Sequence, residues 1–214
     1  RMLFSLPFYI LMAWLASRRE GNKKFTTRQW FFIISMGLFG YYLSSLFDFL
    51  GLQYISAGIE RLILFLYPTF VLLINAFIFK EKISKIQWLA VALSYTGILV
   101  AYWGEFKIDS GNPGFFMGSF LIFLCAITFA IYIAGSGKII PMVGPTKFTA
   151  YAMLFSTAGI FLHFLLAGNY SILKSGSEYM GYGLLIAIVA TVIPSWLVSA
   201  GTKSIGSNNV AIIS

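Results

Sequence analysis

Long apolar stretches recur along this chain, and they restrict its fold more than any other feature of the sequence. A hydrocarbon core about 30 Å thick is crossed by a helix of roughly 20 apolar residues. Of the 214 residues, 59% are hydrophobic and only 10% are charged, whereas soluble domains carry about 25% charged residues. The alternating pattern of a β-barrel, the other fold that spans membranes, does not occur. The apolar stretches lie at 1–16, 30–47, 55–79, 88–103, 114–134, 148–167 and 179–201, and an eighth begins near Asn209. The sequence therefore predicts an all-α, polytopic membrane helical bundle.

The ends of the chain fall within apolar stretches. The chain begins on Arg1, without an initiator Met, and it stops at Ser214 a few residues into the eighth stretch. No cleavable secretory signal is visible, and the apolar helices themselves can direct insertion. We therefore expect further helices before and after this sequence.

Basic residues gather in alternate loops. The counts of Lys and Arg are five in 17–29, three in 80–87, two in 135–147 and one in 202–208. The intervening loops hold only Lys107 and Lys174. Because Lys and Arg mark cytoplasmic loops, we expect these four loops in the cytoplasm and the protein in the cell's inner membrane. The net charge of +8 thus orients the chain, and no nucleic-acid partner is expected.

Residues that would carry catalysis or bind a metal are scarce. Cys125 is the single cysteine and His163 the single histidine, and no phosphate loop, dinucleotide-binding turn or HExxH helix occurs. We therefore expect no catalytic residue, metal or cofactor, and no enzyme activity. A non-transporting membrane protein, either a lipid-modifying enzyme or an assembly factor, stays open as an alternative to a transporter.

Two segments of the chain have weak sequence similarity to segments that lie about 150 residues later. The stretch 1–16 matches 152–167 at a shift of 151, and 44–55 matches 194–205 at a shift of 150. The chain crosses the membrane five times between the matched helices, so the second copy would be inverted. We therefore expect two inverted five-helix repeats, ten helices in the full protein and about seven and a half here.

The order of the motifs is similar to that of a known family. The segments are "GLQYISAGIERLILFLYPTFVLLINAFIFKEKIS" at 51–84, "WLAVALSYTGILVAY" at 88–102 and "KSIGSNNVAIIS" at 203–214. They resemble the EamA branch of the drug/metabolite transporter superfamily. The resemblance implies most of a first EamA repeat at 1–103 (helices 2–5), an outer loop at 104–113, and a truncated second repeat at 114–214 (helices 6–9). It also implies a central cavity between the two halves.

From this resemblance we interpret the chain as a secondary transporter or exporter. The cargo would be a small polar metabolite, such as an amino acid, a nucleoside or a related compound, which crosses the inner membrane by alternating access. Its partners would be the small-molecule substrate and the lipid bilayer. Proton coupling and a homodimer stay open.

Charges inside the apolar stretches are the first candidates for a site. Arg61 lies 18 residues before Phe79, about 27 Å along a helix, and Arg1, Asp48 and Glu60 lie at similar depth in the outer third. Neighbours on a helix point about 100° apart, so we expect Glu60 and Arg61 to pair separately, one with Asp48 and the other with Arg1. Three interpretations stay open: a salt-bridge cluster that ties helices together, an outer gate or substrate site, and proton coupling through a carboxylate.

Other polar residues and prolines are secondary candidates. Tyr41 and Ser45 share a helix face, and Trp196 lies near the related position of the second copy. They could line the substrate pathway, although such residues also pack helices together. Pro68 and Pro194 predict helix kinks, because proline removes a backbone hydrogen bond.

Overall fold

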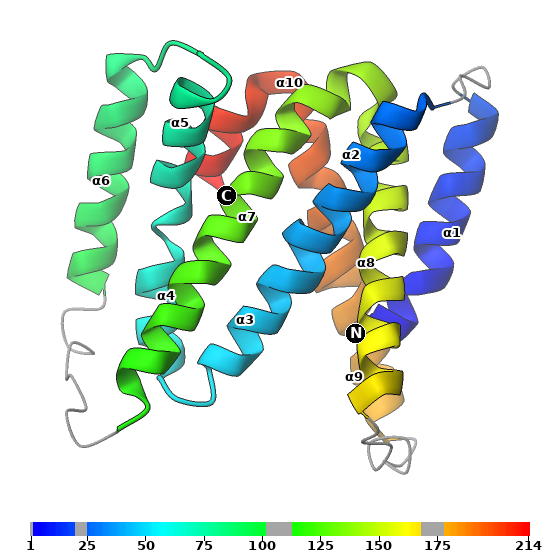
Figure 1. Cartoon of the computed structure of the whole chain (residues 1–214), viewed down its shortest axis with the longest axis horizontal. Coiled ribbons are helices and arrows are strands. Elements are labelled where there is room, and N and C mark those ends of the chain that lie inside the picture. Colours follow the sequence, from blue (N-terminus) through cyan, green and yellow to red (C-terminus); the bar gives the residue numbers. More distant parts are fainter. Residues whose placement is uncertain (1, 20–24, 102–112, 168–177) are drawn as a thin grey trace. The chain divides into compact units, whose positions relative to one another are not determined.

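The computed structural model describes residues 2–19, 25–101, 113–167 and 178–214 (Figure 1). These residues form helices and connecting segments, with no β-strand among them. The α-helices are α1 (Met2–Arg19), α2 (Thr27–Gly37), α3 (Ser44–Gly51), α4 (Ala57–Leu64), α5 (Tyr67–Phe77), α6 (Lys85–Ala101), α7 (Phe115–Val143), α8 (Pro145–Ala167), α9 (Glu178–Ala187) and α10 (Ile193–Ile213). Two segments, η1 (Leu38–Leu43) and η4 (Ile188–Val192), are π-helical. The predicted all-helical membrane bundle is confirmed.

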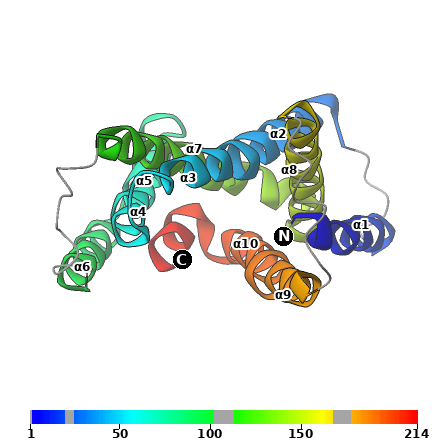
Figure 2. The ribbon, with the colours of Figure 1, turned by 90° about the horizontal axis from the view of Figure 1, so that it is seen from below.

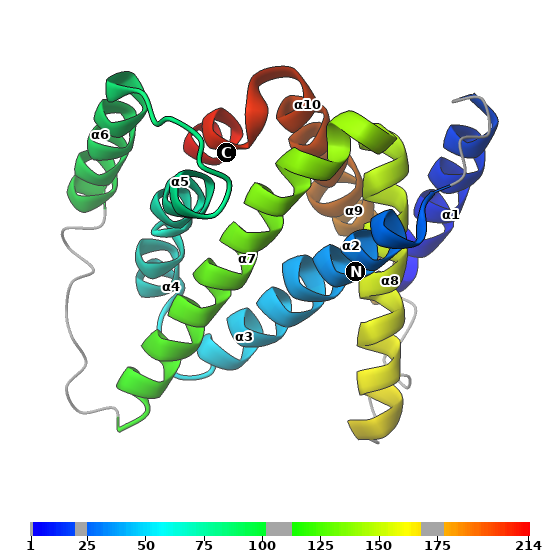
Figure 3. The ribbon, with the colours of Figure 1, turned by 45° about the horizontal axis from the view of Figure 1, so that its top comes forward.

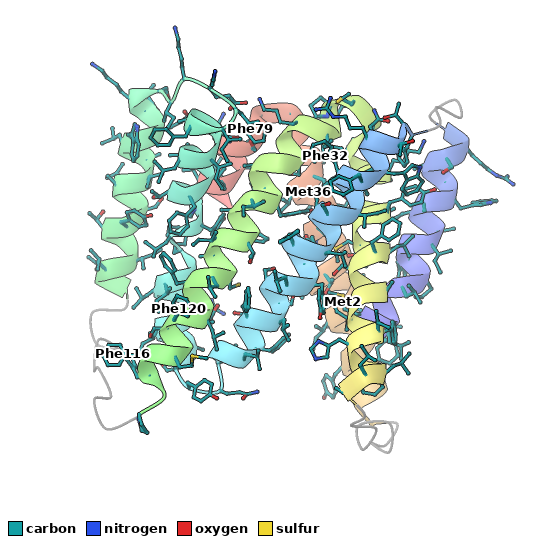
Figure 4. All side chains as sticks on the ribbon, in the orientation of Figure 1. Met2, Phe32, Met36, Phe79, Phe116 and Phe120 are labelled. Carbon is teal, nitrogen blue, oxygen red and sulfur yellow. The ribbon has the colours of Figure 1, made fainter. Side chains whose placement is uncertain are left out.

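The long apolar helices coincide with the predicted stretches. Segments long and apolar enough to cross a membrane are Thr27–Gly51, Ala57–Phe77, Phe115–Val143, Pro145–Ala167 and Gly181–Ile213, and shorter apolar helices run over Met2–Arg18 and Lys85–Val100. Large apolar side chains point outward from them. Phe116 and Phe120 of α7 are 80% and 56% exposed (Figure 4), as expected of a surface that faces lipid.

Two of the four predicted loops are largely helical, so their boundaries were wrong. In 135–147, α7 continues to Val143 and α8 begins at Pro145, which leaves Gly144 as the turn with φ 87°. Glycine adopts positive φ without steric strain, and proline suits the first position of a helix. In 202–208, the two helical segments that make up α10 meet at a break at Gly206. A single glycine therefore replaces each expected loop.

Side-chain caps explain where several helices begin. Thr26 and Gln29 form a reciprocal capping box at the start of α2. Ser84 and Gln87 exchange the same two hydrogen bonds at the start of α6. At α4, the hydroxyl of Ser56 accepts the backbone N–H of Ile59 at 3.4 Å. Such caps satisfy N–H groups that have no partner within the helix.

The described chain divides into two compact units, and the first comprises 1–38 and 136–204. Within it α8 lies against both α1 and α2, and α1 also contacts α9 and η4 (Figure 2). The approach of α2 to α8 requires Gly37, because a Cβ there would lie 2.3 Å from the carbonyl oxygen of Ala152. Small residues at such crossings are typical of membrane helices.

The second unit comprises 39–135 and 205–214. Its η1 and α3 run along α7 (Figure 3). A Cβ on Gly40 would lie 2.3 Å from the ring of Tyr132, and one on Gly51 would lie 2.5 Å from Ile122 and 3.1 Å from the carbonyl oxygen of Gly118. Glycines on both helices therefore allow the close contact.

The two π-helical segments are separated by about the same number of residues as the similar segments of the sequence. They begin at Leu38 and Ile188, 150 residues apart, and each lies within an apolar span. A π-helical turn inside an α-helix is rare and frequently marks a functional site. Each segment is followed directly by an α-helix, α3 or α10, that carries candidate residues.

Candidate functional site

Three of the charged candidates come together in the second unit. The carboxyl groups of Glu60 and Asp48 lie within hydrogen-bonding reach of each other, and the charge of Arg61 acts on Glu60. Glu60 is only 8% exposed, whereas Arg61 is exposed. Buried Cys125 of α7 lies within electrostatic reach of both carboxyl groups. We call Asp48, Glu60 and Arg61 the charged cluster.

The local sequence explains how the charged cluster forms. Asp48 lies near the end of α3, and the turn at 52–56 returns the chain so that Glu60 falls in the first turn of α4. An acidic residue is favourable there, because the N-terminus of a helix carries partial positive charge. The glycines at 51 and 118 hold α3 against α7. Asp48, Glu60 and Cys125 therefore converge from three helices.

The contacts differ from simple ion pairing. We expected Glu60 and Arg61 to pair separately with Asp48 and Arg1, but the structure sets Glu60 beside the other carboxyl group. Arg1 lies outside the described residues. Ionised carboxylates only accept hydrogen bonds, so a hydrogen bond between Asp48 and Glu60 requires a proton on one of them. If the two carboxyl groups are hydrogen-bonded, they hold one proton between them.

The second unit also contains Tyr41, Ser45 and Pro68. Tyr41 packs edge-on against Tyr132 of α7, with ring centroids 5.1 Å apart, and Ser45 is half-buried. The span Ala57–Phe77 is interrupted directly before Pro68, where α4 ends and α5 begins. Proline has no N–H for the carbonyl four residues earlier, which accounts for the interruption.

Trp196 and Pro194 lie in the first unit, at the start of α10. The indole Nε1 of Trp196 donates to the hydroxyl of Thr146 at 3.1 Å, and Trp196 is 39% exposed. Pro194 follows the end of η4. Next to it, the buried hydroxyl of Ser195 is hydrogen-bonded to that of Tyr9 at 2.9 Å. These groups tie α10 to α8 and α1.

Comparison with known proteins assigns the chain to a family. The EamA-like transporter family matches residues 1–103 and again residues 116–214. The chain belongs to this family. It is therefore a multi-pass membrane transporter. The protein lies in the lipid bilayer, and its substrate is a small molecule.

Relatives of this EamA-like transporter carry transporter names. YcbK of Bacillus subtilis (strain 168), an uncharacterized transporter, is 31% identical over 222 residues, which cover 100% of this chain and 69% of the relative. An uncharacterized transporter of Archaeoglobus fulgidus is 26% identical over 129 residues, 60% of this chain and 44% of the relative. One crystal structure matches with a TM-score of 0.72 at 18% identity and covers 99% of this chain and 72% of the other. That likeness supports the fold.

The charged cluster of this EamA-like protein offers groups that can bind a polar ligand. Among the described residues, no group of three or more His, Cys, Asp and Glu side chains could hold a metal ion. The charged cluster offers oxygen acceptors for N–H groups and one guanidinium for an anion. It can therefore recognise polar groups of a cargo or exchange a proton.

Sequence reasoning missed several polar residues of this EamA-like protein. Tyr9 of α1 and Asn75 of α5 are both buried. Asn75 could have been found, because it is the one polar residue in the stretch "FVLLINAFIF" at 70–79. Tyr9 gave no such signal, because a hydroxyl is ordinary in a membrane helix.

Proposed function

We propose that this chain forms the main part of a secondary transporter that moves a small polar metabolite across the inner membrane by alternating access. An amino acid, a nucleoside or a related compound would be the cargo. The observation that carries the proposal is the charged cluster, in which Asp48 and the buried Glu60 meet beside Arg61 within apolar spans. Ionisable groups inside a membrane usually face a cavity or a transport pathway.

We further propose the two-repeat organisation predicted from the sequence, with ten helices in the full protein. Support comes from the two separate matches to the family, at 1–103 and 116–214. The π-helical segments η1 and η4 add support, because they begin 150 residues apart. Transporters of this kind bind cargo near the interface between repeats.

The transport experiment uses purified protein in proteoliposomes and a panel of labelled amino acids and nucleosides. Arg61→Gln should lower transport of the recognised compound at least tenfold while the folded fraction stays unchanged, because Arg61 is exposed and its loss disturbs little packing. Lys82→Gln is the matched control, since Lys82 is also exposed and lies in a predicted cytoplasmic loop. Loss of folding that accounts for the whole loss of transport would instead favour a purely structural cluster.

We also propose proton coupling through the carboxyl pair. The specific observation is the approach of Glu60 to Asp48, which requires a shared proton if the two are hydrogen-bonded. A cargo amine that binds these oxygens would displace that proton. Uptake into proteoliposomes should therefore depend on an imposed pH gradient, and uptake that ignores the gradient would refute the coupling.

A further inference from the structure

Within the first unit, Tyr151 of α8 joins the ends of two other helices. Its hydroxyl is hydrogen-bonded to that of Ser17 of α1 at 3.4 Å. Its ring packs edge-on against the rings of Trp30 of α2 and of Phe25, with centroids 5.1 Å and 5.5 Å apart. The last turn of α1 and the first turns of α2 and α8 therefore lie at the same end of this unit (Figure 1).

Each of the three helices carries a cation at this end. Arg18 lies in the last turn of α1, Arg28 in the first turn of α2 and Lys147 in the first turn of α8. Lys147 precedes Tyr151 by four residues, so the two lie on the same face of α8. No acidic residue lies in α1, α2 or α8. We call Arg18, Arg28 and Lys147 the basic corner.

Aromatic rings hold the cations of the basic corner in place. Lys147 is only 6% exposed, and its Nζ lies 4.4 Å from the ring centroid of Phe25. The guanidinium of Arg18 lies 3.8 Å from the ring centroid of Trp14, and that of the third member lies 5.8 Å from the ring centroid of Phe32. A guanidinium that packs its flat face on a ring can still donate from the N–H groups at its edge to a phosphate.

The positive charge of the basic corner is not offset by the helices. Arg28 and Lys147 lie near helix N-termini, which carry partial positive charge and favour anions. The first turns of α2 and α8 contain no acidic residue. In the sequence, 17–29 holds five basic residues and one acidic residue, Glu20, which lies outside the described residues. An anion at this end would therefore be stabilised by side chains and helices together.

An exposed apolar surface leads up to the basic corner along α1. Leu11 and Trp14 are 52% and 50% exposed, and they precede Arg18 by seven and four residues, so all three share one helix face. Tryptophan is enriched where membrane helices meet the headgroup region. A partner of this surface thus has an anionic head and an apolar tail.

We propose that the basic corner binds the phosphate of an anionic phospholipid, whose acyl chains lie along α1. Arg18 and Arg28 donate to the phosphate oxygens, and Lys147 adds its charge from a buried position. Basic pockets between membrane helices bind anionic headgroups in this way, and the cytoplasmic leaflet supplies such lipids. The proposal does not depend on the cargo or on its transport.

The test compares two lipids on the purified protein in neutral detergent micelles. Phosphatidylglycerol or phosphatidylcholine with the same acyl chains is added, and bound lipid is counted by native mass spectrometry. Phosphatidylglycerol should bind at least fivefold more tightly. The double variant Arg18→Gln with Arg28→Gln should lose at least fivefold in affinity for phosphatidylglycerol, because it loses charge-assisted hydrogen bonds to the phosphate.

A matched variant separates the basic corner from surface charge in general. Lys82→Gln with Lys85→Gln removes the same charge from exposed positions of the second unit, and it should change the affinity less than twofold. Thermal unfolding without added lipid checks that both double variants are folded. If the first does not fold, Arg18→Gln and Arg28→Gln are measured singly, since both side chains are exposed, and each should weaken binding at least twofold.

Three results would overturn the proposal. The first is equal affinity of the unaltered protein for the two lipids, and the second is an equal loss in the corner variants and in the matched variant. The third is binding of inorganic phosphate as tight as that of phosphatidylglycerol, which would show an ion site to which the lipid tails contribute nothing. Selective binding of phosphatidylglycerol that only the corner variants weaken supports the proposal, whatever compound the protein transports.

Discussion

Replacing Glu60 by glutamine or by alanine should separate its role in stability from its role in proton transfer. Glu60 is 8% exposed and its carboxyl group lies beside that of Asp48. In Glu60→Gln, an amide N–H can donate to Asp48 in place of a proton on the Glu60 carboxyl group, but this amide proton cannot be released. In Glu60→Ala, the bond is lost.

The expected magnitudes follow from this geometry. A hydrogen bond to a charged group contributes about 1.5–3 kcal/mol, and burial of Glu60 prevents water from replacing it. Glu60→Ala should therefore lower the free energy of unfolding by about that amount. Glu60→Gln keeps the size and the bond, and we expect a change of less than about 1 kcal/mol.

Two assays on each variant check these values. Reversible unfolding in mixed micelles measures stability, and proteoliposomes measure both gradient-driven uptake and exchange of labelled for unlabelled cargo. Glu60→Gln should lose gradient-driven uptake at least tenfold and keep exchange. A Glu60→Gln protein as unstable as Glu60→Ala would refute the contact with Asp48, and unchanged gradient-driven uptake would refute proton coupling.

Two further predictions concern packing and topology. Gly37→Ala should destabilise the protein by about 1–3 kcal/mol, as overpacking does, because the new methyl group would lie 2.3 Å from a backbone oxygen. In the same unfolding assay, the control Gly97→Ala should be neutral or should stabilise the protein by up to about 1 kcal/mol. The topology test labels single cysteines, Lys85→Cys or Lys174→Cys, in the Cys125→Ser background with a membrane-impermeant maleimide. The two cysteines should react from opposite sides of the membrane. Reaction of both from the same side would contradict the predicted topology.

The apolar stretches predicted the helices well because lipid requires both a minimum length and an apolar composition. Each of the seven stretches coincides with at least one apolar helix. Hydropathy could not locate helix ends beyond the hydrocarbon core, so the predicted loops at 135–147 and 202–208 were too long, and the structure has only a turn at Gly144 and a break at Gly206 there. A helix that continues into the headgroup region has the same polar composition as a loop.

The site was harder to predict than the fold. Depth along the helices grouped Asp48, Glu60 and Arg61 as candidates, and in the structure Asp48 and Arg61 both lie close enough to Glu60 to act on it. Their place in the outer third and their role in transport stay predictions. The meeting of two carboxyl groups depends on the turn at 52–56 and on the glycines at 51 and 118, which sequence spacing does not specify. The sign of φ at Gly206 likewise has no sequence signal beyond the glycine itself.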